Sequence, residues 1–245
     1  MRKLIIFLVA LCCFVPLSAQ NIYVLSVGIC NYKYINGLRQ TETDAKAMAA
    51  LYKTHTPNVS LLLGKNATHD NVLSALKNMC ARAKENDIVV FFFSGHGTKG
   101  GLCAYDTRQN NLISYSEVQK VMRGCRANNK QMYIDACFSG GLRSSSATSA
   151  QNTFKNSSVM LFLSSRNNEM SRENPYGRNG VFTTYLLKGM KGGADANRDR
   201  LITARELFDF VSAKVAKATV NKQHPVMWGK FPDNLHILNW NKKTS

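Results

Sequence analysis

The stretch IVVFFFSGHG, residues 88–97, joins six apolar residues in succession to a Ser-Gly-His-Gly motif. An unbroken apolar run of this length, ended by glycine, is typical of a central strand buried on both faces of a parallel sheet. A second segment, QMYIDAC at residues 131–137, repeats the arrangement and ends in Asp-Ala-Cys. Open α/β sheets bind ligands at the carboxyl ends of their strands. The two segments therefore predict that His96 and Cys137 lie at the same edge of one sheet.

Outward from these segments, strand-like and helix-like stretches alternate along the chain. This alternation predicts an α/β fold, a three-layer sandwich with a central, mostly parallel six-stranded sheet. Residues 140–158, which are rich in Ser, Thr, Asn and Gly, are expected to form a flexible loop within a single domain. Strands are predicted at residues 22–28, 59–63, 88–93, 131–134, 159–163 and 235–238, and helices at 41–53, 68–84, 114–125, 180–190 and 203–217.

The first nineteen residues have the composition of a signal peptide. Arg2 and Lys3 precede an apolar run over residues 4–15, and small residues precede a cut after Ala19. The run is shorter than the ~20 residues that a membrane-spanning helix needs, so a transmembrane anchor is the weaker alternative. We expect an exported protein, periplasmic or secreted, in which residues 20–245 form one domain.

The chain is strongly basic, with 32 Lys and Arg against 15 Asp and Glu and a net charge of +17 at pH 7. Loss of Arg2 and Lys3 with the signal peptide would leave 30 basic and 15 acidic residues, or +15. Such a charge attracts acidic partners but does not specify a fold. The basic residues are spread thinly, without interleaved aromatics or a nucleic-acid motif, so we expect no specific nucleic-acid binding.

The cysteines point to one thiol that stays free. Cleavage after Ala19 removes two of the seven, and an odd count in an exported protein flags an unpaired thiol, for which Cys137 is the natural candidate. The others lack a CxxC spacing, so a metal cluster is not expected, and both buried free thiols and two disulfides stay open. These four are Cys30, Cys80, Cys103 and Cys125.

The two motifs supply the groups that nucleophilic catalysis needs: a thiolate, a partner for its proton, and donors for an oxyanion. Cys137 supplies the thiol, His96 transfers the proton, and the main-chain N–H groups of Gly97 and Cys137 are the expected oxyanion hole. A lone histidine is usually a surface or satisfied core residue, and a lone cysteine is usually a small hydrophobe. The occurrence of both directly after buried strands favours catalysis over these structural alternatives.

These motifs resemble those of the caspase and metacaspase family, and more closely its metacaspase-like bacterial branch. The resemblance implies a caspase-hemoglobinase fold and cleavage of peptide bonds by a Cys–His dyad. It covers nearly all of the chain after the signal peptide. The residues that carry it are 24–28, 43–45, 93–97 and 133–140, with further support from 163–165, Glu169, 180–183, 186–189 and 206–207.

The residues around the thiol bear on specificity. In caspases the nucleophile follows Gln-Ala and the primary pocket is basic, whereas here Asp135 stands two residues before Cys137. The resemblance to metacaspase-like enzymes implies that Asp135, Ser94 and Asp44 hold the side chain of Arg or Lys. Two carboxylates in a partly desolvated pocket would pair strongly with a guanidinium or ammonium group. Asp44 also fits the N-terminus of a helix, three residues after Thr41.

We therefore predict an exported cysteine endopeptidase whose partners are protein or peptide substrates with Arg or Lys at the cleaved bond. Arg143 and Lys155 bracket the Ser-rich stretch. They are candidates for autolytic cleavage that matures the enzyme from a zymogen, since relatives of this family are matured by loop processing. An ordinary surface loop is the alternative. Two other functions stay open. One is a catalytically silent caspase-like module that binds proteins, and the other is a thiol transpeptidase that uses the same dyad.

Residues 195–206 have oxygen donors at positions one, three, five and twelve, as in an EF-hand calcium loop. Position six is Arg200 rather than glycine, and Thr203 with Glu206 also reads as a capping box for the following helix. The dyad chemistry requires no cofactor, and calcium stays an alternative that calorimetry would test. The candidate calcium ligands are Asp195, Asn197, Asp199 and Glu206.

Overall fold

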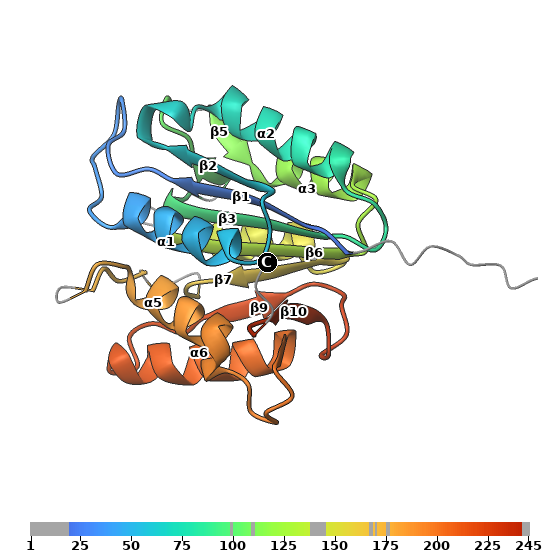
Figure 1. The fold of residues 1–245 in the computed structure, drawn as a ribbon. Helices are drawn as coiled ribbons and strands as arrows, with labels where there is room; N and C mark the ends of the chain where they lie inside the picture. The colour runs from blue at the N-terminus through green and yellow to red at the C-terminus, as the bar shows by residue number, and fades with distance from the viewer. Residues whose placement is uncertain are drawn as a thin grey trace, which may run out of the picture.

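A six-stranded sheet runs through the centre of the molecule (Figure 1). The computed structural model describes residues 20–98, 100–108, 111–137, 146–166, 169, 171–174 and 177–241. The strand order is β2-β1-β3-β6-β7-β9, with every neighbouring pair parallel except β7 and β9. The predicted α/β fold with a mostly parallel six-stranded sheet is thus confirmed. The strands are β1 (Ile22–Gly28), β2 (Val59–Leu63), β3 (Ile88–His96), β6 (Asn129–Cys137), β7 (Val159–Leu163) and β9 (Val226–Trp228).

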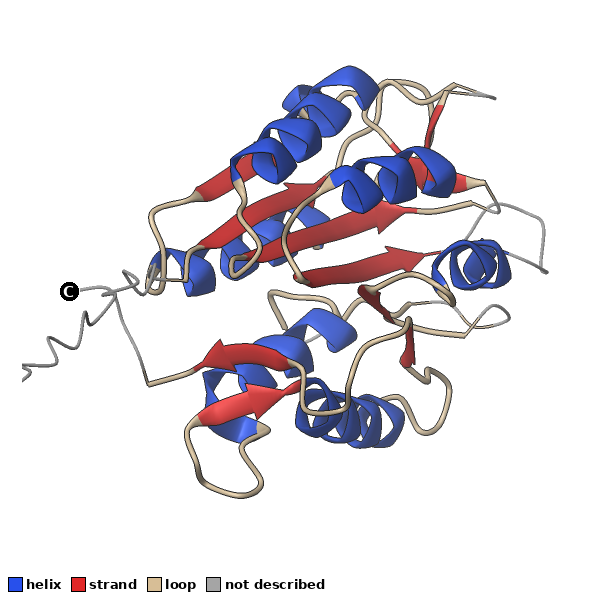
Figure 2. Cartoon of the chain, turned by 90° about the vertical axis from the view of Figure 1, so that its right-hand side faces the viewer, coloured by secondary structure: helices blue, strands red, loops and turns tan. Residues whose placement is uncertain are grey.

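The side chains of β3 are shared between two hydrophobic cores, because successive strand residues point to opposite faces of a sheet. Phe91 and Phe93 join a core with α2, α3 and α4 on one face. Val90 and Phe92 join a core with α1, α5 and α6 on the other. Figure 2 shows helices on both sides of the strands, which is the predicted three-layer sandwich. The helices are α1 (Thr41–Lys53), α2 (His69–Arg82), α3 (Tyr115–Gly124), α4 (Ser146–Phe154), α5 (Val181–Lys188) and α6 (Ala204–Ala218).

Three of the helices begin at side-chain caps. Thr68 caps α2 by accepting a hydrogen bond from a main-chain N–H group of the first turn. Ser114 with Glu117 at α3, and Thr203 with Glu206 at α6, form complete capping boxes. Such caps satisfy N–H groups that have no partner within the helix, so each helix has a defined start.

The sixth strand of the sheet differs from the prediction. The segment expected as the last strand is β10 (His236–Asn239), which pairs with β8 (Leu201–Thr203) in a separate antiparallel pair. The sheet is instead completed by β9, which the sequence analysis did not predict. Its three residues are all half-buried. A segment of three residues is too short to show the alternation or the long apolar run by which a strand is recognised in a sequence. The short pair β4 (Gly101–Cys103) and β5 (Leu112–Ser114) was not predicted either.

The stretch at residues 140–158, expected as a loop, contains the helix α4. The loop prediction was wrong for residues 146–154, because Ala150 and Phe154 are spaced one helical turn apart and are both buried. They join the core beside α3 and β7. Residues 138–145 lie outside the described part of the chain.

The predicted signal peptide, residues 1–19, also lies outside the described residues. Among the helices that the structure does describe, none combines the length and the apolar character needed to cross a membrane.

Four cysteines other than Cys137 are free thiols in the structure. Three of them are buried and one is half-buried, so they are small side chains packed within the fold rather than cross-links. They are Cys30, Cys80, Cys103 and Cys125.

Candidate active site

His96 and Cys137 end two neighbouring strands at the carboxyl edge of the sheet. β3 and β6 run parallel, and their register pairs Ser94 with Asp135 and His96 with Cys137. Neighbouring strands lie about 4.8 Å apart, so the main chains at residues 96 and 137 are side by side. The structure thus brings together the two positions that the sequence analysis assigned to the thiol and its proton partner.

The imidazole of His96 is held by the segment that follows β1. Its Nε2 lies 3.0 Å from the main-chain oxygen of Asn36. The Tyr32 ring is tilted against it, with 5.1 Å between centroids, and the Tyr32 hydroxyl accepts a 2.7 Å hydrogen bond from the His96 main-chain N–H. Because a carbonyl only accepts hydrogen bonds, Nε2 carries the hydrogen, and in the neutral ring Nδ1 is the nitrogen that can take a proton. Asn36 therefore supplies an orienting group for the imidazole.

The two main-chain groups proposed as oxyanion donors lie at this same edge. Gly97 directly follows His96 and is buried, and it forms an isolated antiparallel bridge with Leu102. Cys137 is the register partner of His96. Both N–H groups therefore lie at the strand ends that carry His96 and Cys137, and their role as oxyanion donors stays a prediction.

Asp44 lies in the first turn of α1 and is only 2% exposed. Its Oδ1 accepts hydrogen bonds of 2.9 Å from the Asn179 side chain and from the main-chain N–H of Gly180. Its Oδ2 accepts a 2.9 Å hydrogen bond from the Ser94 hydroxyl. These partners come from β3 and from the segment before α5, and none is an N–H group of α1. The carboxylate thus bonds to the site rather than capping its own helix.

Asp135 lies in β6 and is 5% exposed. Its Oδ2 accepts hydrogen bonds from Thr183, of 2.7 Å from the hydroxyl and 3.3 Å from the main-chain N–H. Its Oδ1 accepts a hydrogen bond from the Ser171 hydroxyl. Thr183 is in the first turn of α5, where the positive end of the helix dipole favours a carboxylate. The start of α5 and the segment after β7 therefore both hold this side chain.

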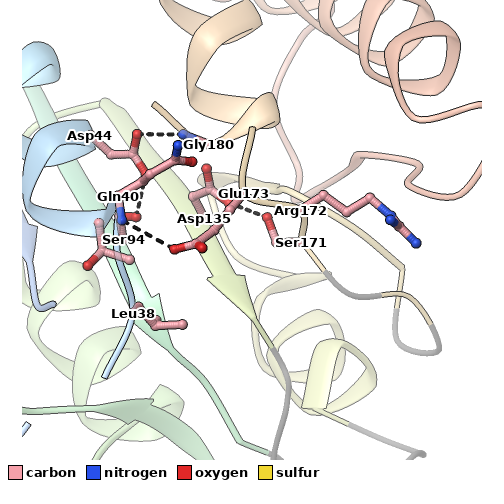
Figure 3. A pocket seen from close by; sticks show the side chains of 10 residues that line it. Leu38, Gln40, Asp44, Ser94, Asp135, Ser171, Arg172, Glu173 and Gly180 are labelled. Carbon is pink, nitrogen blue, oxygen red and sulfur yellow. Dashed lines mark hydrogen bonds between the residues drawn. The ribbon is translucent and has the colours of Figure 1, made fainter. Parts of the chain in front are cut away.

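Both carboxylates line one pocket, which Figure 3 shows together with Ser94 and Gly180. A methyl group on Gly180 would lie 3.1 Å from Asp135 Oδ2 and 3.3 Å from Asp44 Oδ2, so a side chain at this position would crowd both oxygens. Burial, and next the neighbouring Asp135, raise the pKa of Asp44 to about 8. Burial likewise raises the pKa of Asp135. The pocket therefore disfavours two negative charges until a cation offsets them.

Two segments far apart in the sequence are tied together beside this pocket. Gln40 accepts a 2.9 Å hydrogen bond from the main-chain N–H of Asn174 and donates to the main-chain oxygens of Asn174 and Gly177 at 2.7 and 2.8 Å. Glu173 Oε1 accepts from the main-chain N–H groups of Arg39 and Gln40 at 2.7 and 3.2 Å. These bonds fix the segment after Ser171 against the start of α1.

Several groups that build the site were missed by the sequence analysis. Two of them fall in the stretch 180–183, which carried the family resemblance and could have pointed to them. The others act through a main-chain carbonyl or through a single hydroxyl, ring or amide in an irregular segment, where no periodic pattern or motif marks them. The missed residues are Tyr32, Asn36, Ser171, Asn179, Gly180 and Thr183.

The predicted calcium loop, residues 195–206, turns sharply without glycine. Arg198 and Arg200 have φ angles of 64° and 71°, which are left-handed values. An EF-hand loop uses glycine at its sixth position, here Arg200, for such a turn. The departure from the EF-hand pattern at this position therefore does not prevent the turn.

The side chains proposed as calcium ligands bond within the protein. Asp195 accepts hydrogen bonds from the main-chain N–H groups of Asp199 and Arg200, each at 3.1 Å. Asn197 Oδ1 accepts from the Asp199 N–H at 2.9 Å, and Glu206 belongs to the capping box of α6. In the described part of the chain, no three His, Cys, Asp or Glu side chains are grouped to hold a metal ion. Calcium binding stays a prediction.

The two candidate autocleavage residues differ in what can be said of them. Arg143 lies outside the described residues. Lys155 is exposed directly after α4, and its main-chain N–H donates a 2.8 Å hydrogen bond to Gln151. Lys155 therefore lies on the surface, and cleavage beside it stays a prediction.

The fold and the site together describe an α/β protein with a cysteine and an imidazole in register at a sheet edge, beside a pocket that contains two buried carboxylates. This arrangement is typical of hydrolases that use a thiol nucleophile. Residues 23–236 match the caspase domain family, and the chain belongs to this family. Membership makes the protein a candidate cysteine peptidase that acts on protein substrates. No curated protein matches the chain by sequence.

Among solved structures, the fold is similar to that of protein GSU0716 from Geobacter sulfurreducens. The two superpose with a TM-score of 0.68 at 18% sequence identity, over 90% of this chain and 98% of the other. At this identity the likeness shows a shared fold.

Proposed function

We propose that this protein is an exported cysteine endopeptidase that cleaves peptide bonds after Arg or Lys. The observation that carries the proposal is the pair of buried carboxylates, Asp44 and Asp135, in a pocket beside the register pair His96–Cys137. A guanidinium or ammonium group in this pocket would form charge-assisted hydrogen bonds with both carboxylates and offset their mutual repulsion. An aspartate side chain would instead add another negative charge beside the two buried carboxylates.

In the proposed reaction, Nδ1 of His96 takes the proton of the Cys137 thiol, and the thiolate attacks the carbonyl carbon of the scissile bond. The main-chain N–H groups of Gly97 and Cys137 stabilise the oxyanion. His96 then gives the proton to the leaving amine as the C–N bond breaks. Water attacks the resulting thioester with His96 as base, which releases the acid and restores the thiol.

A set of peptide amides that differ only in the residue before the fluorogenic group tests the specificity. Arg and Lys peptides should be hydrolysed, whereas the citrulline peptide, a neutral copy of arginine in shape, should have kcat/KM lower by about 100-fold or more, because two buried carboxylates lose their counter-charge. Leu and Asp peptides should be equally poor. Equal turnover of the Arg and citrulline peptides, or a preference for Asp, contradicts the proposal.

Two further measurements with these peptides separate the two alternative functions. A transpeptidase would transfer the acyl group to an added amine, and mass spectrometry would detect the new amide. A silent binding module would bind the Arg peptide without turnover that depends on Cys137.

Autolytic maturation by cleavage after Arg143 or Lys155 is a second part of the proposal. It is supported by the basic specificity proposed above and by the exposure of Lys155. Mass spectrometry of purified wild-type protein should show cleavage at one of these residues, while a Cys137→Ala variant stays intact. An intact wild-type chain, or equal nicking of both proteins, rules autolysis out. The same spectra show whether residues 1–19 have been removed, as export requires.

Calcium binding at residues 195–206 is proposed on the ligand spacing alone. Titration calorimetry with calcium chloride should show uptake that an Asp195→Ala variant lacks. The absence of binding heat in the wild-type protein would show that the protein does not bind calcium.

A further inference from the structure

Gln223 lies far from the site in sequence, between α6 and β9, yet its amide reaches the segment that holds Asp135. The residue has no exposed surface. Its Nε2 donates a 2.9 Å hydrogen bond to the main-chain oxygen of Ser164, directly after β7. Its Oε1 accepts a 3.0 Å hydrogen bond from the main-chain N–H of Arg172. One side chain therefore ties together both ends of the segment 164–172.

The same amide continues to the pocket through one hydroxyl. Gln223 Nε2 lies 3.5 Å from Ser171 Oγ, and Ser171 donates its own hydrogen to Asp135. Because a hydroxyl has one hydrogen, Ser171 can only accept from Gln223 while it donates to the carboxylate. Hydrogen bonds are thus donated in one direction, from Gln223 to Ser171 and from Ser171 to Asp135. This direction fixes the rotation of the Ser171 hydroxyl toward the carboxylate.

The neighbouring residue, His224, also bonds to the segment 164–172. The main-chain N–H of His224 donates a 2.6 Å hydrogen bond to Glu169 Oε2, and His224 Nδ1 lies 2.7 Å from Glu169 Oε1. On the other side, the Gln223 main-chain N–H donates to the Thr219 hydroxyl at 3.1 Å, which anchors it to the end of α6. Gln223 is therefore held in place independently of the pocket that it supports.

We propose that Gln223 is a positioning residue for the pocket lined by Asp44 and Asp135. It holds Ser171 so that the Asp135 carboxylate is fixed in orientation toward the cationic group of the substrate. The inference rests on the proposed function. It assigns Gln223 to recognition of the substrate side chain and not to bond cleavage, because its contacts lead to Asp135 and not to His96.

The test compares Gln223→Met, which keeps the bulk of the side chain and removes its hydrogen bonds, with a matched control. Gln131 is equally buried and also bonds two segments, donating to the main-chain oxygens of His236 and Ile237. It lies about 13 Å along β6 from Asp135, at four residues of 3.3 Å each. Gln131→Met should therefore lose stability without altering the pocket.

Steady-state kinetics on the Arg peptide should show KM raised about tenfold or more by Gln223→Met, the loss expected for a weakened hydrogen bond to a charged group, with kcat changed less than about threefold. The rate of Cys137 alkylation by iodoacetamide, which needs no pocket, should be unchanged. Ser171→Ala should match Gln223→Met, and the double variant should be no worse than either single one. A fall in kcat at constant KM, or the same behaviour from Gln131→Met, overturns the inference.

Binding measured without turnover keeps this inference separate from the proposed function. Calorimetry should show that acetyl-arginine methylamide binds a Cys137→Ala protein and that Gln223→Met in this background weakens binding about tenfold. If wild-type protein binds this ligand but hydrolyses no peptide, the peptidase proposal fails while the binding comparison still decides the role of Gln223. If the Cys137→Ala protein binds no arginine ligand, both fail. Should Gln223→Met not fold, Ser171→Ala provides the same comparison.

Discussion

Replacing Cys137 with alanine is expected to lower kcat on Arg and Lys peptides by at least about 10³-fold, because the proposed acyl-enzyme forms on this thiol. His96→Ala should lower it by about 10² to 10⁴-fold, since the thiol then lacks its proton acceptor. The two changes together should cost no more than Cys137→Ala alone, because the two groups act as a unit. Hydrolysis of a fluorogenic Arg peptide by each purified variant is the measurement.

Cys103→Ala is a matched control for the loss of a thiol. Burial raises the pKa of Cys103 to about 11, so this group stays a protonated and unreactive thiol at neutral pH. Its removal should leave both turnover and labelling by iodoacetamide unchanged. Asn36→Ala should also retain activity, because the group that orients His96 is the main-chain carbonyl at this position. Full turnover by His96→Ala would contradict the dyad.

Asp135→Asn is expected to lower kcat/KM on the Arg peptide by about 10² to 10³-fold, the cost of leaving a buried cation without one of its partners. The asparagine keeps the shape of the side chain and removes its negative charge. Turnover of the citrulline peptide should change much less, and this difference between two peptides of the same shape isolates the electrostatic effect. A parallel fall for both peptides would show that the substitution damaged the fold of the site instead.

Asp44→Asn should weaken catalysis on Arg peptides but stabilise the empty protein. The pKa of Asp44 is raised to about 8 by burial and by the neighbouring Asp135. A carboxyl whose pKa is higher in the folded than in the unfolded state contributes stability below the unfolded value, near 4, that is lost as the pH rises through about 8. The asparagine carries no such charge at high pH, so its gain should be greatest at pH 8 to 9.

Thermal unfolding between pH 4 and 9, in a Cys137→Ala background that prevents autolysis, measures this effect. A tenfold change in the acid dissociation constant between the unfolded and folded protein corresponds to about 1.4 kcal/mol, so the gain above pH 8 should be on the order of a few kcal/mol. It should be small near pH 4, where the carboxyl is protonated in the folded protein and about half protonated in the unfolded chain. A gain of the same size at pH 4 and pH 9 would mean that packing, and not charge, is responsible.

The sequence identified the strands and residues of the site where the relevant signal is local. The apolar runs before His96 and Cys137 predicted buried strands, and a parallel sheet brings the ends of neighbouring strands together. The register of β3 and β6 then pairs these residues directly. The placement of Asp44 in the pocket came from family resemblance, because its position in the first turn of α1 is equally compatible with a helix cap.

The elements missed in the sequence had weak local signals. Strand β9 has three half-buried residues and joins the sheet by pairing with β7. Helix α4 lies in a stretch whose polar composition is typical of loops, and the burial of Ala150 and Phe154 against other helices and strands stabilises it. In both cases contacts with distant segments outweigh weak local preferences.

By itself the sequence determined the α/β fold, the two strand ends that carry a thiol and an imidazole, and the residue types available for chemistry, because these depend on apolar periodicity and short motifs. Only the tertiary structure decided that the Asn36 carbonyl faces His96, that Ser171 and Thr183 hold Asp135, and that Gln223 reaches Ser171 from 52 residues away. Hydrogen bonds of this kind depend on where main-chain and side-chain atoms from distant segments meet in space. No spacing along the chain encodes those positions.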